Sequence, residues 1–139
     1  MKGVDTNILA RFYVDDPNDP EAAKQRPIAR RILTESKQLF VPLTVILEFE
    51  WVLRAFYHFD ANDFRHVVEH LLGLANVIVE ESPRVSQALV LQAEGLEFAD
   101  ALHLMACHQC ESFYSFDDRR FARRAKRLAL PISVIVPSE

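Results

Sequence analysis

The stretch KGVDTNIL, residues 2–9, joins a short strand-like run to a helix through a single aspartate, Asp5. Its patterning predicts a strand over Lys2–Val4 and a helix over Thr6–Tyr13. The same alternation of short strands with helices continues along the rest of the chain. Because strands that alternate with helices are typical of a parallel sheet covered on both faces, we expect an α/β fold.

The remaining elements follow the same alternation. Asp19 is expected to cap a helix that begins at Pro20, and Pro27 is expected to interrupt or restart it. Asp60 is expected to cap a helix that runs to Leu74. The other expected helices after the first are Pro20–Ser36, Leu43–Tyr57, Ser82–Ala93, Phe98–Cys110 and Arg119–Leu128. The expected strands are Gln38–Val41, Asn76–Val79, Phe113–Phe116 and Ile132–Val136. With no internal repeat or linker, we expect one domain over residues 1–139 with a mostly parallel sheet of four to five strands.

Composition and charge narrow the functional class. The chain has 139 residues of which 50% are hydrophobic, which is enough for a real core. Its formal net charge of −4 argues against a surface built wholly to bind nucleic acid, but it allows a local basic patch. Three glycines cannot form a Gly-rich phosphate loop. The sequence shows no signal region and no apolar run of membrane-spanning length, so we expect a cytoplasmic protein without a membrane partner.

Four acidic residues lie in otherwise apolar stretches: Asp5, Glu48, Asp100 and Asp117. A buried carboxylate without a partner is costly, so it usually neutralises or binds a cation. Ligands of open α/β sheets bind at the carboxyl ends of the strands, and Asp5 and Asp117 follow the first and fourth expected strands. Ligation by oxygen alone favours Mg²⁺ or Mn²⁺ over zinc. We therefore predict that the four carboxylates share a divalent metal ion.

Two glutamates on one predicted helix provide an internal comparison. Glu48 and Glu50 are two residues apart, so their side chains point to roughly opposite sides of the helix. Glu50 has Arg54 four residues later, the favourable orientation for an ion pair, and is predicted to face solvent. No charge within the helix balances Glu48, which is therefore predicted to point inward with a functional role.

The aspartates also have ordinary structural interpretations. Asp5 and Asp117 could cap the helices that follow them, and Asp118 could be the cap in place of Asp117. Asp100 could be a buried carboxylate that is hydrogen-bonded to His103 or to nearby backbone groups. Each aspartate taken alone is therefore weak evidence for a functional site. Four carboxylates that lack an obvious partner nearby in the sequence are harder to explain separately, and together they favour a common role.

Glu97 lies one turn before Asp100 on the expected helix. Its position in the first turn favours a solvated acid that interacts with the positive end of the helix dipole. Glu97 is therefore interpreted as a surface residue and not as a member of the acidic site.

Four stretches occur in a recognisable order: VDTNIL at 4–9, LEFEWVL at 47–53, FADALH at 98–103 and SFD at 115–117. Together they resemble the PIN-domain family, and specifically the VapC-like ribonuclease toxins of bacterial toxin–antitoxin pairs. The resemblance spans essentially the whole chain. It implies a three-layer α/β/α sandwich, a ribonuclease activity that depends on Mg²⁺ or Mn²⁺, homodimerisation, and a small VapB-like antitoxin that blocks the site within a larger assembly.

The resemblance also implies roles for individual residues. The catalytic and metal-binding acids would be Asp5, Glu48, Asp100 and Asp117. Thr6 and Asn7 match the polar positions after the first acid and would orient it. Family members often have a further acid two residues beyond the last aspartate, where this chain has Arg119. Whether Asp118 takes that place stays open, as do the number of metal ions and the division of roles.

A basic tract, RRFARRAKR at 119–127, begins just after Asp117. On a helix, Phe121, Ala125 and Leu128 would form the inward face and leave the cations exposed. The tract could be a solvated face whose later charges favour the helix C-terminus. Its position beside the acidic site instead favours contact with RNA phosphates. The residues expected to make this contact are Arg119, Arg120, Arg123 and Arg124.

The two cysteines, Cys107 and Cys110, form a CxxC motif. No second CxxC is present for a closed zinc site, and the motif does not lie between a strand and a helix as in thioredoxin-like proteins. The cysteines are therefore interpreted as structural or incidental.

Three other functions were compared with the nuclease. A receiver-like signalling module also binds Mg²⁺ at strand ends, but it needs an acidic pair after the first strand and a lysine after a late strand. A metal-dependent phosphatase usually needs a second aspartate where this chain has Asn7. A PIN-like fold kept only for binding RNA or protein is the main alternative, and a cleavage assay with and without EDTA separates it from the enzyme.

Overall fold

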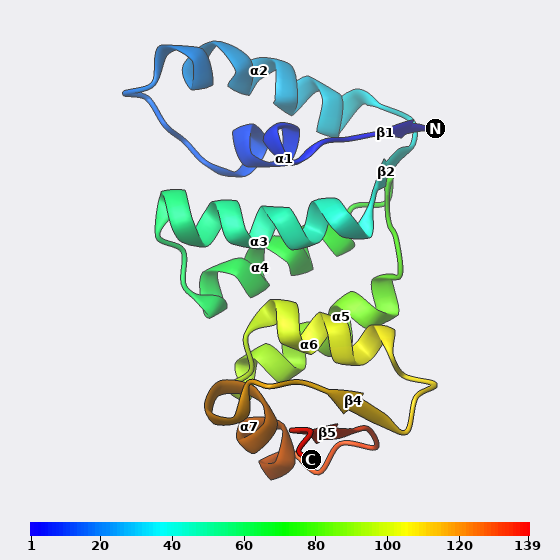
Figure 1. The fold of residues 1–139 in the computed structure, drawn as a ribbon. Helices are drawn as coiled ribbons and strands as arrows, with labels where there is room; N and C mark the ends of the chain where they lie inside the picture. Colours follow the sequence, from blue (N-terminus) through cyan, green and yellow to red (C-terminus); the bar gives the residue numbers. More distant parts are fainter. The chain divides into compact units, whose positions relative to one another are not determined.

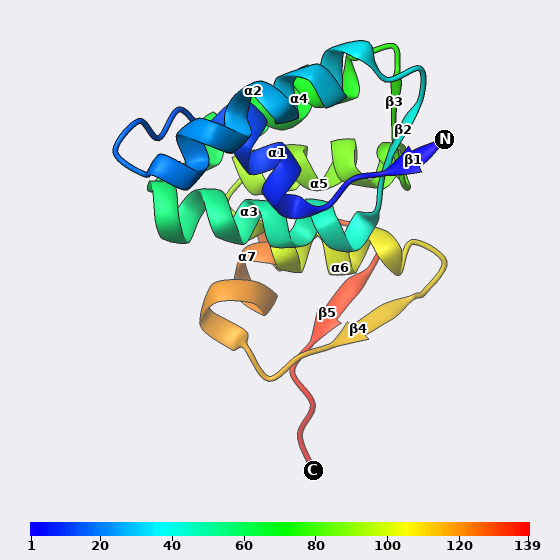
Figure 2. The same cartoon turned by 90° about the horizontal axis from the view of Figure 1, so that it is seen from above.

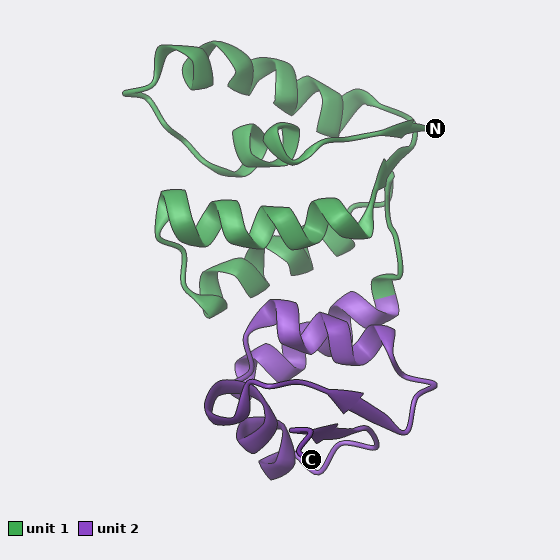
Figure 3. Ribbon diagram, in the orientation of Figure 1, with its two compact units in different colours: residues 1–82 green, residues 83–139 purple.

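The computed structural model describes residues 1–139 and divides into two compact units (Figures 1 and 3). The N-terminal unit comprises Met1–Ser82 and the C-terminal unit comprises Pro83–Glu139. None of the helices combines the length and the apolar character that crossing a lipid bilayer would require.

A three-stranded parallel sheet lies in the N-terminal unit. Its strands are β1 (Lys2–Gly3), β2 (Leu39–Val41) and β3 (Val77–Val79), in that spatial order (Figure 2). Leu39 and Val41 of the central strand are fully buried, as expected for a parallel strand with neighbours on both sides. Because the strands are parallel, their carboxyl ends share one edge, and the chain enters its next helix from that edge after each strand.

Four helices complete the N-terminal unit: α1 (Thr6–Tyr13), α2 (Pro20–Glu35), α3 (Leu43–Tyr57) and α4 (Ala61–Leu72). Helix α1 packs against both α2 and α3 (Figure 1). Asp19 caps α2 as predicted, and Asp60 begins α4 through a capping box with Asp63. The expectation that Pro27 would interrupt α2 is wrong, since the helix runs through it. Pro27 and Ala23, four residues before it, are exposed, so water can bind the carbonyl that lacks a partner.

The core of the N-terminal unit is centred on Phe49 of α3, which is fully buried. Its ring centroid lies 6.3 Å from that of Phe64 in an edge-to-face arrangement and 6.0 Å from that of Tyr13. Rings from α1, α3 and α4 therefore meet at one point and hold these helices together by apolar burial.

The C-terminal unit contains three α-helices, a π-helical turn and a two-stranded parallel sheet. Its elements are α5 (Ser82–Ala93), which begins at the boundary, α6 (Phe98–Ala106), β4 (Ser112–Tyr114), a π-helical turn η1 (Asp118–Ala122), α7 (Arg123–Arg127) and β5 (Ser133–Ile135). Strands β4 and β5 run side by side, with Phe113 opposite Val134 (Figure 2).

The predicted α/β class with parallel strands is confirmed, and all five expected strands occur. They form a three-stranded and a two-stranded sheet in place of one sheet of four to five strands. Strand β4 ends at Tyr114, before the predicted end at Phe116. The hydroxyl of Ser115 accepts a hydrogen bond from the backbone N–H of Asp117 at 3.1 Å, and this local bond turns the chain out of the strand.

Two predicted helices also differ from the structure. Helix α6 ends at Ala106 and not at Cys110, because a turn closed by a bond from the Cys110 N–H to the Cys107 carbonyl (2.8 Å) replaces its last turn. The predicted basic helix is divided into η1 and α7. Of the three residues expected to face inward, Phe121 and Ala125 are buried and Leu128 is half-buried, so the predicted apolar face is confirmed at its first two positions.

Candidate functional site

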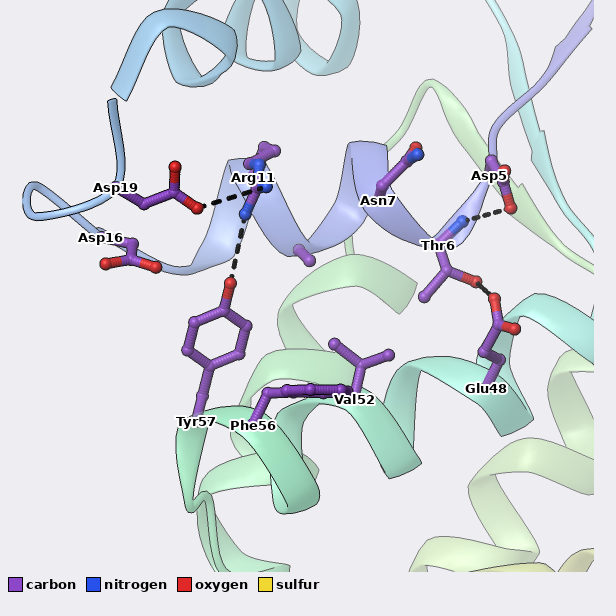
Figure 4. A pocket seen from close by; sticks show the side chains of 11 residues that line it. Asp5, Thr6, Asn7, Arg11, Asp16, Asp19, Glu48, Val52, Phe56 and Tyr57 are labelled. Carbon is purple, nitrogen blue, oxygen red and sulfur yellow. Dashed lines mark hydrogen bonds and ion pairs between the residues drawn. The ribbon is translucent and has the colours of Figure 1, made fainter. Parts of the chain in front are cut away.

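A pocket of about 530 Å³ lies beside α1 in the N-terminal unit (Figure 4). The N-cap and the first turn of α1 contribute Asp5, Thr6 and Asn7 to its wall, and α3 contributes Glu48. The other lining residues are Ala10, Arg11, Asp16, Asp19, Val52, Phe56 and Tyr57. The pocket thus brings together two of the predicted acids and both of the predicted supporting residues of this unit.

Thr6 connects the two acids of the pocket (Figure 4). Its backbone N–H donates to Asp5 Oδ1 at 2.8 Å, and its hydroxyl donates to Glu48 Oε1. Thr6 is buried, whereas Asp5 and Glu48 are exposed. Each carboxylate uses one oxygen in its bond with Thr6, so the other oxygen remains available to a ligand. By accepting the Thr6 N–H, Asp5 also caps helix α1, which is the ordinary structural role expected for it. The cap uses one carboxylate oxygen, so the other can still bind a cation.

The structure corrects the prediction for the two glutamates of α3. The ion pair is confirmed, since Arg54 Nε lies 2.9 Å from Glu50 Oε2. The predicted orientation is wrong, because Glu50 is buried with 7% of its surface exposed and Glu48 is exposed. Pairing with the long arginine side chain allows the Glu50 carboxylate to leave water. Glu48 instead lies at the open pocket, where the hydroxyl of Thr6 is its partner.

Arg11 is a pocket residue that the motifs do not reveal. Its Nε donates to Gln25 Oε1 at 2.9 Å. Its guanidinium also donates to the Tyr57 hydroxyl at 3.1 Å and lies 4.0 Å from Asp19 Oδ2 (Figure 4). These contacts place a fixed positive charge in a pocket whose other charged lining residues are all acidic. Arg11 follows Asn7 by four residues, so both lie on one face of α1, and this spacing is the sequence signal that could have identified it.

The other two predicted acids, Asp100 on α6 and Asp117 before η1, lie in the C-terminal unit. Burial raises the pKa of the Asp100 carboxyl, the negative charges of Glu97 and Asp117 raise it further, and His103 and Arg124 lower it. The influence of Asp117 means that the two aspartates lie close enough to interact. Glu97 is exposed as predicted, but its charge acts on Asp100, so it belongs to the surroundings of this pair.

The raised pKa of Asp100 predicts that its replacement has a pH-dependent effect on stability. The folded state holds the proton of this carboxyl more tightly than the unfolded chain does, so ionisation destabilises the fold as the pH rises above the ordinary pKa of aspartate. Asp100→Asn is therefore expected to stabilise the protein at neutral pH, by at most about 1 kcal/mol because the side chain is partly exposed. The gain is expected to vanish below the ordinary pKa of aspartate.

Urea unfolding of wild type and the Asp100→Asn variant at neutral and acidic pH measures this effect. Glu111→Gln, which alters an exposed carboxylate of the same unit, is the control and is expected to show no pH-dependent gain. A gain of equal size at both pH values would mean that the charge of Asp100 is not its cause.

Asp117 and Asp118 have different partners, which separates their roles. Asp117 is exposed, and its Oδ1 accepts the backbone N–H of Arg120 at 3.0 Å as the cap of η1. Asp118 Oδ2 lies 3.0 Å and 2.9 Å from two guanidinium nitrogens of Arg123. Because Asp118 is already paired with a cation, Asp117 is the better candidate for a metal ligand in this segment.

The four arginines expected to contact RNA also differ in their surroundings. Arg119 and Arg120 are exposed and make no ion pair. Arg123 is held by Asp118, and Arg124 donates to the backbone carbonyl of Gly95 at 3.1 Å. Only the first two therefore present a guanidinium without a protein partner.

The carboxylates of the chain fit a hard divalent cation. Each unit holds one interacting pair, Asp5 with Glu48 through Thr6 and Asp100 with Asp117. Neither unit by itself gathers three or more His, Cys, Asp or Glu side chains in a metal-binding arrangement. Mg²⁺ is commonly held by one or two carboxylates and completes its coordination with water and substrate phosphates, so a pair of this kind is a suitable ligand set.

Comparison with known protein families supports the same chemistry. The family model described as PIN domain matches residues 3–127, which is most of the chain. Proteins with this domain are generally metal-dependent nucleases that use divalent ions such as Mg²⁺ or Mn²⁺. No curated protein matches the chain.

Proposed function

The chain belongs to the PIN-domain family, and on this premise we propose that it is a divalent-metal-dependent ribonuclease acting as the toxin of a toxin–antitoxin pair. In this function it hydrolyses phosphodiester bonds within RNA chains. The observation that carries the proposal is the arrangement of Thr6, which holds Asp5 and Glu48 on the wall of one pocket. Partly buried hydrogen bonds fix the two carboxylates while each keeps an oxygen free.

The proposed metal-binding and catalytic acids are Asp5, Glu48, Asp100 and Asp117. Thr6 positions the first two by its backbone N–H and its hydroxyl, and Asn7 lines the same pocket. Asp118 is proposed to support the site by holding Arg123. All 139 residues are proposed to act as a single PIN domain.

The chemistry follows from the charges that these residues carry. A bound Mg²⁺ or Mn²⁺ would polarise a phosphate oxygen, lower the pKa of the attacking water and stabilise charge on the leaving oxygen. The chain would contribute the carboxylates that hold the cation. Glu48 keeps one oxygen beyond its bond with Thr6, and that oxygen would either bind the cation or orient the attacking water. Arg11 supplies a positive charge in the same pocket for a substrate phosphate.

Cleavage of total cellular RNA by the purified protein tests the activity. With Mg²⁺ or Mn²⁺ the protein is expected to produce discrete fragments, and an excess of EDTA is expected to stop the reaction. Mapping the new ends would identify the cleaved sites. A protein that binds RNA and leaves it intact with either metal would instead support a PIN fold kept for binding.

The proposed partners are RNA, a small VapB-like antitoxin and a second copy of the chain. Phe56 lines the pocket and is 62% exposed, so an antitoxin that blocks the site would find an apolar contact there. Expression of the chain alone is expected to arrest growth, and co-expression of the antitoxin is expected to restore it. Light scattering that finds twice the 16.0 kDa mass of one chain would support the homodimer.

Arg119 and Arg120 are expected to contribute to RNA binding through phosphate contacts, because both are exposed and unpaired. A variant with Arg119→Gln and Arg120→Gln is expected to bind RNA more weakly. The slope of the logarithm of its RNA-binding constant against the logarithm of the salt concentration is expected to be shallower. The difference is about 0.7 for each phosphate of single-stranded RNA that the variant no longer neutralises. Fluorescence anisotropy at several salt concentrations measures this slope.

A control with the same change in net charge is available in the N-terminal unit. Arg30 and Arg31 are adjacent and exposed on α2, and replacing both with glutamine is expected to leave the slope nearly unchanged. Equally weakened binding in the two double variants would show that net charge is responsible and that Arg119 and Arg120 make no specific contact.

A further inference from the structure

The connection between α6 and β4 places the two cysteines of the chain at the two ends of one turn. Cys107 follows the last residue of α6, and the Cys110 N–H donates to the Cys107 carbonyl at 2.8 Å. A hydrogen bond from the fourth residue of a segment to the carbonyl of the first closes a β-turn, and the Cα atoms of these two residues then lie within about 7 Å of each other. Cys107 and Cys110 hold these two positions. Disulfides usually join Cα atoms separated by about 4.4–6.8 Å. The backbone of the turn is therefore suited to a disulfide.

The two thiols also lie near each other and differ in their exposure. Cys107 is partly buried, and Cys110 is exposed. Burial raises the pKa of the Cys107 thiol, and the neighbouring Cys110 raises it further. Cys107 is thus the more shielded member of the pair, while Cys110 is open to a reagent in solution.

We propose that Cys107 and Cys110 form a redox modification site that is oxidised reversibly by small-molecule disulfides. The Cys110 thiolate attacks one sulfur of the reagent, releases one small thiol and forms a mixed disulfide. Cys107 then loses its proton, attacks the Cys110 sulfur and releases the second small thiol. The two protein thiols lose two electrons and two protons, and the reagent is reduced to two thiols. The proposal does not depend on the nuclease function.

The position of the turn distinguishes this site from that of a thiol–disulfide oxidoreductase. A CxxC at a helix N-terminus gains thiolate stabilisation from the helix, but this motif follows the C-terminal end of α6. The pair is therefore a target of oxidation and not a catalyst of it. Because Cys110 is exposed, the disulfide is also accessible to reductants, as labile disulfides are.

Oxidation at this turn would act on the segment between two of the proposed acids. The turn leads from α6, which carries Asp100, to β4, which is followed by Asp117. A disulfide across the turn would restrict the backbone of this connection. The oxidised protein is therefore expected to open its 107–110 turn less often, which amide hydrogen exchange can detect.

Intact-mass measurement of the reduced protein treated with oxidised glutathione tests the proposal. Wild type is expected to lose two hydrogen atoms without retaining glutathione, and a reductant is expected to reverse the change. Cys107→Ser is expected to retain one glutathione at Cys110, because the thiol that resolves the mixed disulfide is missing. Cys110→Ser is expected to react several-fold more slowly, since its remaining thiol is partly buried.

Three results would overturn the proposal: glutathione retained on both cysteines of wild type, a disulfide that links two chains, or no reaction with folded wild type. Circular dichroism of each serine variant shows whether it is folded. The wild-type measurement needs no substitution, so the proposal is tested even if a variant does not fold.

Discussion

Replacing Asp5 with asparagine is expected to lower the kcat/KM of RNA cleavage by at least about a hundredfold, which corresponds to the few kcal/mol that metal ligation contributes. The fold is expected to persist because asparagine is as good a helix cap as aspartate. Its side-chain oxygen can still accept the Thr6 N–H, which lies 2.8 Å from Asp5 Oδ1. The substitution therefore removes the charge that would hold a cation and leaves the start of α1 in place.

A second aspartate of the same pocket is a matched control. Asp16 lines the pocket but is not one of the proposed metal ligands, so Asp16→Asn is expected to retain most of the activity. Cleavage rates measured over a range of Mg²⁺ concentrations, with the melting temperature of each variant, separate catalysis from folding. Normal cleavage by Asp5→Asn, or equal reductions in both variants, would contradict the assignment of Asp5.

Replacing Phe49 with alanine is expected to destabilise the fold by about 3–5 kcal/mol. Phe49 is fully buried and packs against the rings of Tyr13 and Phe64, so its removal leaves a cavity where three helices meet. Natural domains have a total stability of about 5–15 kcal/mol, so this decrease is a large fraction of the whole. Urea unfolding followed by circular dichroism measures it.

Phe56 provides the comparison, since it is the same residue type on the same helix and is 62% exposed. Phe56→Ala is expected to change the free energy of unfolding by no more than about 1 kcal/mol, because it creates no cavity and removes an edge-to-face ring pair with Trp51 at the surface. Similar destabilisation in both variants would mean that burial of Phe49 is not what stabilises this helix cluster.

Local sequence signals were sufficient to identify several elements and the candidate acids. The predicted bounds of α1 and α3 agree with the structure, and Asp19 and Asp60 cap the helices that they were predicted to cap. These features depend on residues within one or two helical turns of each other. A capping side chain and an apolar period act on neighbouring backbone, so their effect can be predicted without knowledge of the fold.

Only the tertiary structure decided how these elements are used. Thr6 and Glu48 are 42 residues apart, and their hydrogen bond exists because α1 packs beside α3. The same packing leaves Glu48 exposed at the pocket, while pairing with Arg54 allows Glu50 to be buried. The pattern of α3 alone had predicted the opposite exposure for these two glutamates. The sequence by itself determined which residues are acidic and where helices begin. Burial and long-range bonds depend on neighbours distant along the chain, so the fold determined which acids share a pocket.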